Sequence, residues 1–326
     1  ILSLSANLKV TGWLTLQARG NMDYSADKLR QKFYASTATA LCGMNGRYIE
    51  MDYQETLMYG DVMAMAKKKL NDFTLDIAIG GSINDKVVNS TRIDSKNASL
   101  KFANVFNLAN IVMSSSASID QKIDAHYQLQ SVFATAQAGY KEGVFLDLTA
   151  RNDWSSTLAY TKYEKKGFFY PSIGVSFLPD KWVKMPEWVS FSKLRGAYSI
   201  VGNGVPPFIT YPVSYVTAGG GMLASDAAPF AEMKPEMTHS VELGMEWKFL
   251  QHRLGLNLTY YRTNTYEQFF KLPALAGDKY AYRYVNAGDI QNQGWEITLD
   301  ATPVLTSDFT WKTSMNFSAN KNKIVE

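Results

Sequence analysis

Two alternating segments within residues 240–261 constrain the fold of this chain more strongly than any other feature. In both segments every second side chain is apolar: Val241, Leu243, Met245, Trp247 and Phe249 in the first, and Leu254, Leu256, Leu258 and Tyr260 in the second. Successive side chains of a strand point to opposite faces, so each segment has one apolar face and one polar face. Each segment is about ten residues long, enough to cross a bilayer at a tilt of roughly 45°. Strands of soluble sheets usually stop at about five or six residues. The pattern therefore favours a transmembrane β-hairpin over a soluble one.

The same alternation predicts further strands along the chain, at residues 73–83, 122–140, 144–154, 168–178, 189–201, 294–301 and 309–319. A strand-like run at 8–24 with 29–34 as its partner, and a strand or turn within 92–110, complete the set. Residues 37–69 lack a clean period of two, which indicates an extended loop. At residues 61–70 the sequence allows either a short helix or a segment that leads into the next strand. The stretches 202–235 and 269–287 predict two more long loops. The turn at 141–143 contains a glycine that we expect at positive φ.

Short turns at one end of the strands and long loops at the other are typical of outer-membrane barrels. The pattern gives roughly ten to twelve strands, about half of the 22 strands found in the largest plugged transporters. We therefore expect an all-β fold, an antiparallel transmembrane β-barrel segment, with residues 1–326 belonging to a single barrel domain. The sequence does not begin with methionine, and its first residues do not have the features of a signal peptide. We therefore expect this chain to be a segment of a longer protein.

The composition narrows the function without naming it. The 326 residues include 33 Lys and Arg against 30 Asp and Glu, a balance that argues against a nucleic-acid-binding protein. The aromatic content of 13% suits two membrane-border girdles, and it also suits a soluble sugar-binding β-protein. No apolar run reaches the length of a transmembrane helix. Cys42 is the only cysteine, so no internal disulfide and no cysteine zinc cluster can form.

Several short motifs occur in a fixed order along the second half of the chain. They are Arg151-Asn-Asp-Trp-Ser-Ser156, Tyr170-Pro-Ser172, Lys193-Leu-Arg195 with Tyr198 and Gly202-Asn203, Glu242-Leu-Gly244, Tyr260-Tyr261, Asn286-Ala-Gly-Asp-Ile290 with Asn292, Gly294 and Glu296, and Asn320 with Asn322. Together they resemble the SusC/RagA family of TonB-dependent outer-membrane transporters. The resemblance covers mainly residues 121–326, and the plug domain and the terminal strands of that family are not in the chain.

The resemblance implies import of large nutrients, oligosaccharides or peptides, across the outer membrane of a Gram-negative bacterium. It implies a SusD-like surface lipoprotein as partner, TonB as a second partner acting through the absent N-terminal region, and outer-membrane lipid around the barrel. It implies no cofactor and no enzymatic activity.

Charged residues near strand ends are the candidate functional residues. A charge that faces lipid near the middle of a bilayer costs about 2–4 kcal/mol, so we expect these side chains to face the barrel lumen. The expected polar network, which faces the lumen or the plug, comprises Arg151, Asp153, Lys193, Arg195, Glu242 and Glu296. Trp154, Tyr211 and Tyr215 are candidate loop contacts to substrate, because aromatic rings can stack on sugars. The alternative is that they belong to the aromatic girdle at the lipid headgroups.

No pattern predicts catalysis or metal binding. Glu242, Glu246, Glu296 and Asp300 alternate along strands without a shared cleft of the kind that glycoside hydrolysis needs. The three histidines lack metal-ligand spacing. The alternative outside the transporter class is a soluble β-sheet carbohydrate-binding module, which would have to cover the apolar row of residues 254–260 with a second sheet. A barrel enzyme is a further alternative and would need a nucleophile–base pair that the sequence does not offer.

Overall fold

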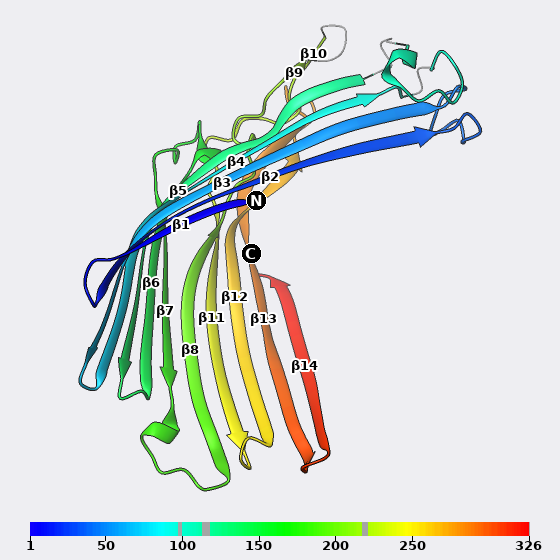
Figure 1. Cartoon of the computed structure of the whole chain (residues 1–326). Helices are drawn as coiled ribbons and strands as arrows, with labels where there is room; N and C mark the ends of the chain where they lie inside the picture. The colour runs from blue at the N-terminus through cyan, green and yellow to red at the C-terminus, as the bar shows by residue number, and fades with distance from the viewer. Residues whose placement is uncertain (97–99, 113–117, 217–220, 326) are drawn as a thin grey trace.

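The computed structural model describes residues 1–96, 100–112, 118–216 and 221–325. Within these residues, twelve antiparallel strands form one sheet in the order β1-β2-β3-β4-β5-β6-β7-β8-β11-β12-β13-β14. Every strand pairs with its neighbours along the sheet, the arrangement of an up-and-down barrel wall (Figure 1). In the part of the chain described, β1 and β14 do not pair with each other, so the sheet is an open arc. The prediction of an antiparallel barrel segment with ten to twelve strands is confirmed.

Most of the strands, but not β1 or β7, are longer than the roughly 9–11 residues that cross a membrane. Their bounds are β1 Leu2–Lys9, β2 Leu14–Phe33, β3 Arg47–Leu70, β4 Phe73–Asp94, β5 Ser118–Tyr140, β6 Val144–Ser155, β7 Phe168–Phe177, β8 Val189–Asn203, β11 Glu236–Phe249, β12 Leu254–Pro273, β13 Tyr282–Leu305 and β14 Thr310–Ile324. The hairpin predicted at residues 240–261 consists of β11 and β12, which have 14 and 20 residues, whereas about ten residues were expected in each. The extra length projects from the membrane-crossing part toward the long loops.

Turns and loops segregate to opposite ends of the sheet, as Figure 1 shows. The lower end in that view carries the connections 10–13, 71–72, 141–143, 178–188, 250–253 and 306–309, and the upper end carries 34–46, 95–117, 156–167, 204–235 and 274–281. The upper connections include a small hairpin of β9 Tyr215–Val216 and β10 Met222–Leu223 and two 3₁₀ turns, η1 Leu108–Asn110 and η2 Ser156–Leu158. A third 3₁₀ turn, η3 Pro179–Lys181, lies at the lower end. Among the described residues, no helix is long and apolar enough to cross a membrane.

Two of the predicted loops consist wholly or partly of strand residues. Residues 47–70 form β3 and pair residue by residue with β2 and β4, so neither an extended loop nor a helix exists at 61–70. The period of two is hidden there because both faces of β3 are apolar: Leu57, Met63 and Met65 alternate with Val62 and Ala64. The predicted loop at 269–287 shrinks to residues 274–281, because β12 and β13 stay paired as far as Pro273 and Tyr282.

The turn at 141–143 differs from expectation in one detail. Lys141 and Glu142 have φ of 49° and 50°, whereas Gly143 is not among the glycines with positive φ. The Cβ of any residue placed at 143 would lie 2.2 Å from the Trp182 indole nitrogen. Gly143 is therefore required by the close approach of Trp182 and not by its own backbone conformation.

Loops at the upper end pack into two small cores. In the first, Tyr48, Leu100 and Ile111 are buried against Ile93 and Phe106. In the second, Leu158, Val205 and Met233 are buried, with Phe269 of β12 and Tyr284 of β13 among the side chains packed on them. The long connections are thus folded onto the strand projections.

Candidate functional site: the inner wall and the loop roof

Strand register carries the alternation of residues 240–261 across the whole sheet. Leu243 of β11 is paired with Tyr260 of β12, which is paired with Trp295 of β13, whereas Glu242 is paired with Tyr261 and then Gly294. We name the face with Leu243 the outer face and the face with Glu242 the inner face. Because a charge facing lipid costs about 2–4 kcal/mol, the inner face is the one that lines the lumen. In the described residues no second sheet covers the outer face, and Leu243 is 55% exposed.

Arg195 of β8 is the centre of one inner-face contact group. Its NH2 nitrogen donates to the Thr259 hydroxyl at 2.7 Å, and its Nε lies 3.4 Å from Glu242 Oε1. The guanidinium lies directly over Gly244, where an added Cβ would lie 2.5 Å from Arg195 Nε. Two of the recognised motifs, Lys193-Leu-Arg195 and Glu242-Leu-Gly244, are therefore two halves of one contact.

A second motif glycine does the same for a tyrosine. An added Cβ on Gly294 would lie 2.7 Å from the hydroxyl of Tyr261, and that hydroxyl donates to Asn320 Oδ1 at 3.2 Å. Residues from three separate motifs thus meet on β12, β13 and β14. The spacing of these motifs along the chain follows from strand register.

Arg151 and Asp153, the other predicted pair, also lie on the inner face. Arg151 Nε donates to Asp153 Oδ1 at 2.6 Å, and its NH2 nitrogen donates to the Ser131 hydroxyl at 2.7 Å. Lys193 is paired in register with Glu246, and Glu296 with Thr259, but no ion pair joins either to the groups above among the described residues. The structure therefore brings together Arg151 with Asp153 and Arg195 with Glu242, and it leaves Lys193 and Glu296 outside these contacts.

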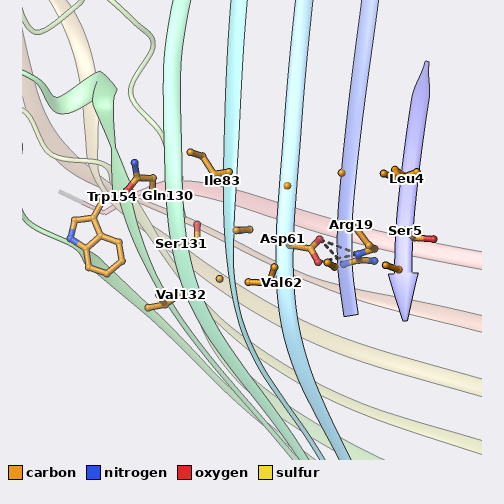
Figure 2. A pocket seen from close by; sticks show the side chains of 16 residues that line it. Leu4, Ser5, Arg19, Asp61, Val62, Ile83, Gln130, Ser131, Val132 and Trp154 are labelled. Atoms are coloured by element: carbon orange, nitrogen blue, oxygen red, sulfur yellow. Dashed lines mark hydrogen bonds and ion pairs between the residues drawn. The ribbon is translucent and has the colours of Figure 1, made fainter. Parts of the chain in front are cut away.

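One buried inner-face carboxylate, that of Asp61, was not anticipated from the sequence. The Asp61 side chain is fully covered and receives Arg19 through Nε at 3.0 Å and through NH2 at 2.9 Å, as Figure 2 shows. Asp61 lies in the stretch where both faces of β3 are apolar, which hid the strand and with it the pairing. Arg19 of β2 and Asp61 of β3 can be recognised as a pair only once the register of the two strands is known.

The outer face has a hollow of about 770 Å³ across β1 to β6 (Figure 2). Small outward residues in register produce it: Gly20 is paired with Gly60, and Val62 with Gly81. Trp154 lines this hollow from the end of β6, where it is paired with Gln130. Trp154 is therefore part of a strand on the outer face, close to the 156–167 loop, where a Cβ added at Gly167 would lie 2.9 Å from its ring.

We name the described parts of the packed connections 156–167 and 204–235 the loop roof. Asn286 of β13 joins this roof to the strands. Its Nδ2 donates to the carbonyls of Glu267 at 2.7 Å and Lys234 at 3.1 Å, and its Oδ1 accepts from the Lys234 backbone N–H at 2.9 Å. Next to it the pairing of β12 with β13 skips Glu267 and Gly288, which have φ of 56° and 86°. The Asn-Ala-Gly motif thus marks a local break in the β12–β13 pairing, next to which Asn286 anchors the 204–235 loop. Lys234 also pairs with Glu267 at 2.8 Å, and this hydrogen bond raises the pKa of Lys234.

The aromatic loop candidates are only partly described. Tyr211 stacks on Tyr160 with ring centroids 5.1 Å apart, and the two residues are 55% and 72% exposed. Tyr160 has φ of 65°, an unusual conformation for a bulky residue. Tyr215 lies in β9, and its side chain is outside the described part of the structure. The pair formed by Tyr160 and Tyr211 bridges two different loops, which sequence spacing could not predict.

The tip of β2 to β4 carries a further charged group beyond the membrane-crossing part. Lys28 lies 2.8 Å from Glu50, and the Tyr48 hydroxyl also donates to Glu50. The hydrogen bond from Lys28, followed by that from Tyr48, lowers the pKa of Glu50 to about 2. The buried Asp94 receives Arg47 at 2.7 Å; burial opposes its ionisation, but the Arg47 hydrogen bond and the Lys96 backbone N–H outweigh burial and lower its pKa.

Comparison with known proteins identifies the class. Residues 2–324 match the family described as TonB dependent receptor-like, beta-barrel, and the chain belongs to this family. TonB-dependent receptor P3 of Formosa agariphila is 29% identical over 209 residues, which cover 61% of this chain and 20% of that protein. TonB-dependent receptor SusC of Bacteroides thetaiotaomicron is 27% identical over 189 residues, which cover 53% of this chain and 18% of that protein. The predicted resemblance to the SusC/RagA group is confirmed.

Solved structures show the same fold. The structure of the RagAB peptide importer in the 'open-open' state matches 99% of this chain with a TM-score of 0.82 at 20% identity, and this chain covers 36% of that one. The outer membrane transporter YddB from Escherichia coli matches with a TM-score of 0.64 at 11% identity, with 99% of this chain and 41% of that chain covered. The matched region thus spans about a fifth of the curated relatives and about a third of the RagAB chain.

Proposed function

We propose that this chain is part of the barrel wall of an outer-membrane transporter that imports large nutrients, oligosaccharides or peptides, powered by TonB and assisted by a SusD-like surface lipoprotein. The observation that carries the proposal is the contrast between the two faces of one continuous sheet. The inner face holds hydrogen-bonded charged groups such as Arg195 with Glu242, and the outer face is apolar and uncovered. Such a wall separates lipid from a polar passage.

The relatives support the nutrient class. SusC and the RagAB peptide importer are the named proteins whose sequence or fold the chain resembles. The packed loop roof, built on Leu158, Val205 and Met233, offers a shaped surface at the end where a lipoprotein would cap the barrel. The inner wall needs no catalytic group for this role, because it acts by lining a passage.

The test uses the full-length protein in its own bacterium. Uptake of labelled oligosaccharide and peptide pools is compared between the parent strain and strains that lack the transporter, TonB or the SusD-like lipoprotein. The proposal predicts that one pool enters only when all three proteins are present. Uptake that persists without TonB, or a full-length protein that stays monodisperse without detergent, would contradict it.

A further inference from the structure

A basic patch lies on the outer face just above the apolar surface of β11 to β14. It consists of Arg262 of β12 with Lys321 and Lys323 of β14, all three exposed. In register, Arg262 is paired with Gln293 and Gln293 with Lys321, while the next outward row is Asn264, Gln291 and Lys323. Neighbouring strands are about 4.8 Å apart, so the three cations lie within about 10 Å of one another before their long side chains extend.

The patch lies where the membrane border is expected. The outward row directly below Arg262 contains Tyr260 and Trp295, whose ring centroids are 4.7 Å apart. Paired tyrosine and tryptophan rings mark the membrane–water interface of barrels. Farther down, the outer face is apolar and exposed, with Leu299 at 42% and Phe317 at 61%. The cations are thus the first charged outward residues beyond the apolar surface on β12 and β14.

Among the residues that the structure describes, the cations of this patch have no ion-pair partner. No ion pair of the described residues involves Arg262, Lys321 or Lys323; Arg262 Nε donates to a neutral amide, Asn264 Oδ1, at 3.3 Å. The nearest acidic side chain in this register is Asp289, one row higher, and its two oxygens accept hydrogen bonds from Asn264 Nδ2 at 2.8 and 3.0 Å. The other titratable neighbour is His239, which is paired with Asn264 and hydrogen bonded to the Tyr198 hydroxyl.

Corresponding positions elsewhere on the outer face are different. On β2 the first charged outward residue is Lys28, which is paired with Glu50 at 2.8 Å. On β4 it is Asp85, an acidic residue that lies 3.8 Å from His126 and accepts from Gln128. On β2 and β4 the corresponding positions therefore do not present an unpaired positive charge.

We infer that Arg262, Lys321 and Lys323 bind the phosphorylated headgroup of an outer-leaflet lipid whose acyl chains lie along Leu299 and Phe317. A guanidinium supplies a planar pair of donors to phosphate, and two ammonium groups add point charges beside it. Basic clusters at a membrane border recognise anionic headgroups in this way, at about 1 kcal/mol or roughly fivefold in affinity per cation. The inference rests on the outer-membrane location proposed above.

The experiment measures lipid bound to the full-length protein in detergent by native mass spectrometry. The probes are monophosphorylated lipid A, the same lipid without its phosphate, phosphatidylglycerol, and inorganic phosphate as a competitor. The variant is R262Q/K321Q/K323Q. The control is K68Q/K312Q, which removes two lysines near the turn end of the strands. Both variants are checked for the heat-dependent gel shift of a folded barrel.

Binding of the phosphorylated lipid A should fall by about a hundredfold in the triple variant and stay unchanged in the control, at roughly fivefold per cation. The dephosphorylated lipid should bind wild type as weakly as the triple variant binds the phosphorylated one. Equal binding of the two lipids by wild type, or unchanged binding in the triple variant, would overturn the inference. Tighter binding of phosphatidylglycerol, or full displacement by millimolar inorganic phosphate, would also overturn it, because the site would then recognise a different phosphate source.

The two proposals fail separately. If the protein shows no lipid preference but still needs detergent and still supports uptake, only the lipid-site inference is contradicted. If the protein needs no detergent, both the lipid-site inference and the proposed function are contradicted.

Discussion

Truncation of Leu158 should release the loop roof while leaving the barrel folded. Leu158 is 1% exposed and packs with Val205 and Met233, so the 156–167 loop holds the 204–235 loop through this contact. Replacing a buried leucine by alanine costs about 2–5 kcal/mol. A value of about 3 kcal/mol corresponds to an increase of roughly a hundredfold in the fraction of molecules whose roof is open. The strand side chains packed on this cluster are Phe168 of β7, Phe269 of β12 and Tyr284 of β13, which lie toward the loop ends of their strands.

The assay is limited trypsin digestion of the full-length L158A protein in detergent, followed through cleavage after Lys162 and Lys234. When opening and closing are fast, the cleavage rate tracks the open fraction. L223A is the matched control, because Leu223 lies in the 204–235 loop that Leu158 holds in place, and it is 61% exposed. Cleavage should accelerate by about two orders of magnitude in L158A only, with an unchanged heat-dependent gel shift. An acceleration below about threefold, or an equal effect of L223A, would refute the packing argument.

Three further changes probe the other contacts. In G244A the new Cβ must displace Arg195 from Thr259, so the thermal midpoint of the barrel should fall by an amount equivalent to about 1–3 kcal/mol; the control G255A, whose Cβ has nothing closer than 3.6 Å, should change it little, and equal effects would contradict the account. N286A leaves three backbone groups without partners and should speed tryptic cleavage after Lys234 at a cost of about 1–3 kcal/mol; an unchanged rate would show that the Asn286 hydrogen bonds do not hold the loop. The lowered pKa of Glu50, about 2, means that its contribution to stability is complete above its unfolded pKa and is lost as pH falls through about 2. Hydrogen exchange of the 47–52 amides, corrected for intrinsic rate, should therefore lose protection between pH 4.5 and 2.5 in wild type but not in E50Q, and identical profiles would contradict this.

The sequence predicts the fold wherever one face of a strand is polar. Residues 240–261 alternate cleanly because Glu242 and Glu246 face the lumen while Leu243 and Met245 face lipid, and the period of two is then legible. The pattern fails in β3, where Leu57, Met63 and Met65 make the inner face apolar as well. Strand pairing supplies what periodicity lacks there, and pairing is a long-range property that single-sequence patterns do not contain.

The candidate site was predictable only as a set of inward residues. Alternation placed Arg151, Asp153, Arg195 and Glu242 on one face, but which of them touch depends on register across β5 to β12. The motif residues Gly244 and Asn286 could be recognised as a resemblance, and their physical roles became clear from Arg195 above the glycine and from the loop backbone bound to the asparagine. Contacts between loops, such as Tyr160 with Tyr211, leave no periodic signal at all.

The central claim is that one face of this wall contacts lipid and the other contacts the aqueous lumen. Spin labels attached to single cysteines at positions 240–248 of β11, in full-length protein carrying C42S and reconstituted in vesicles, test it directly. Accessibility to oxygen, which concentrates in lipid, should peak at 241, 243, 245 and 247, and accessibility to a water-soluble nickel chelate should be highest at the even positions. Accessibility that does not alternate, or that alternates with the opposite phase, would contradict the account.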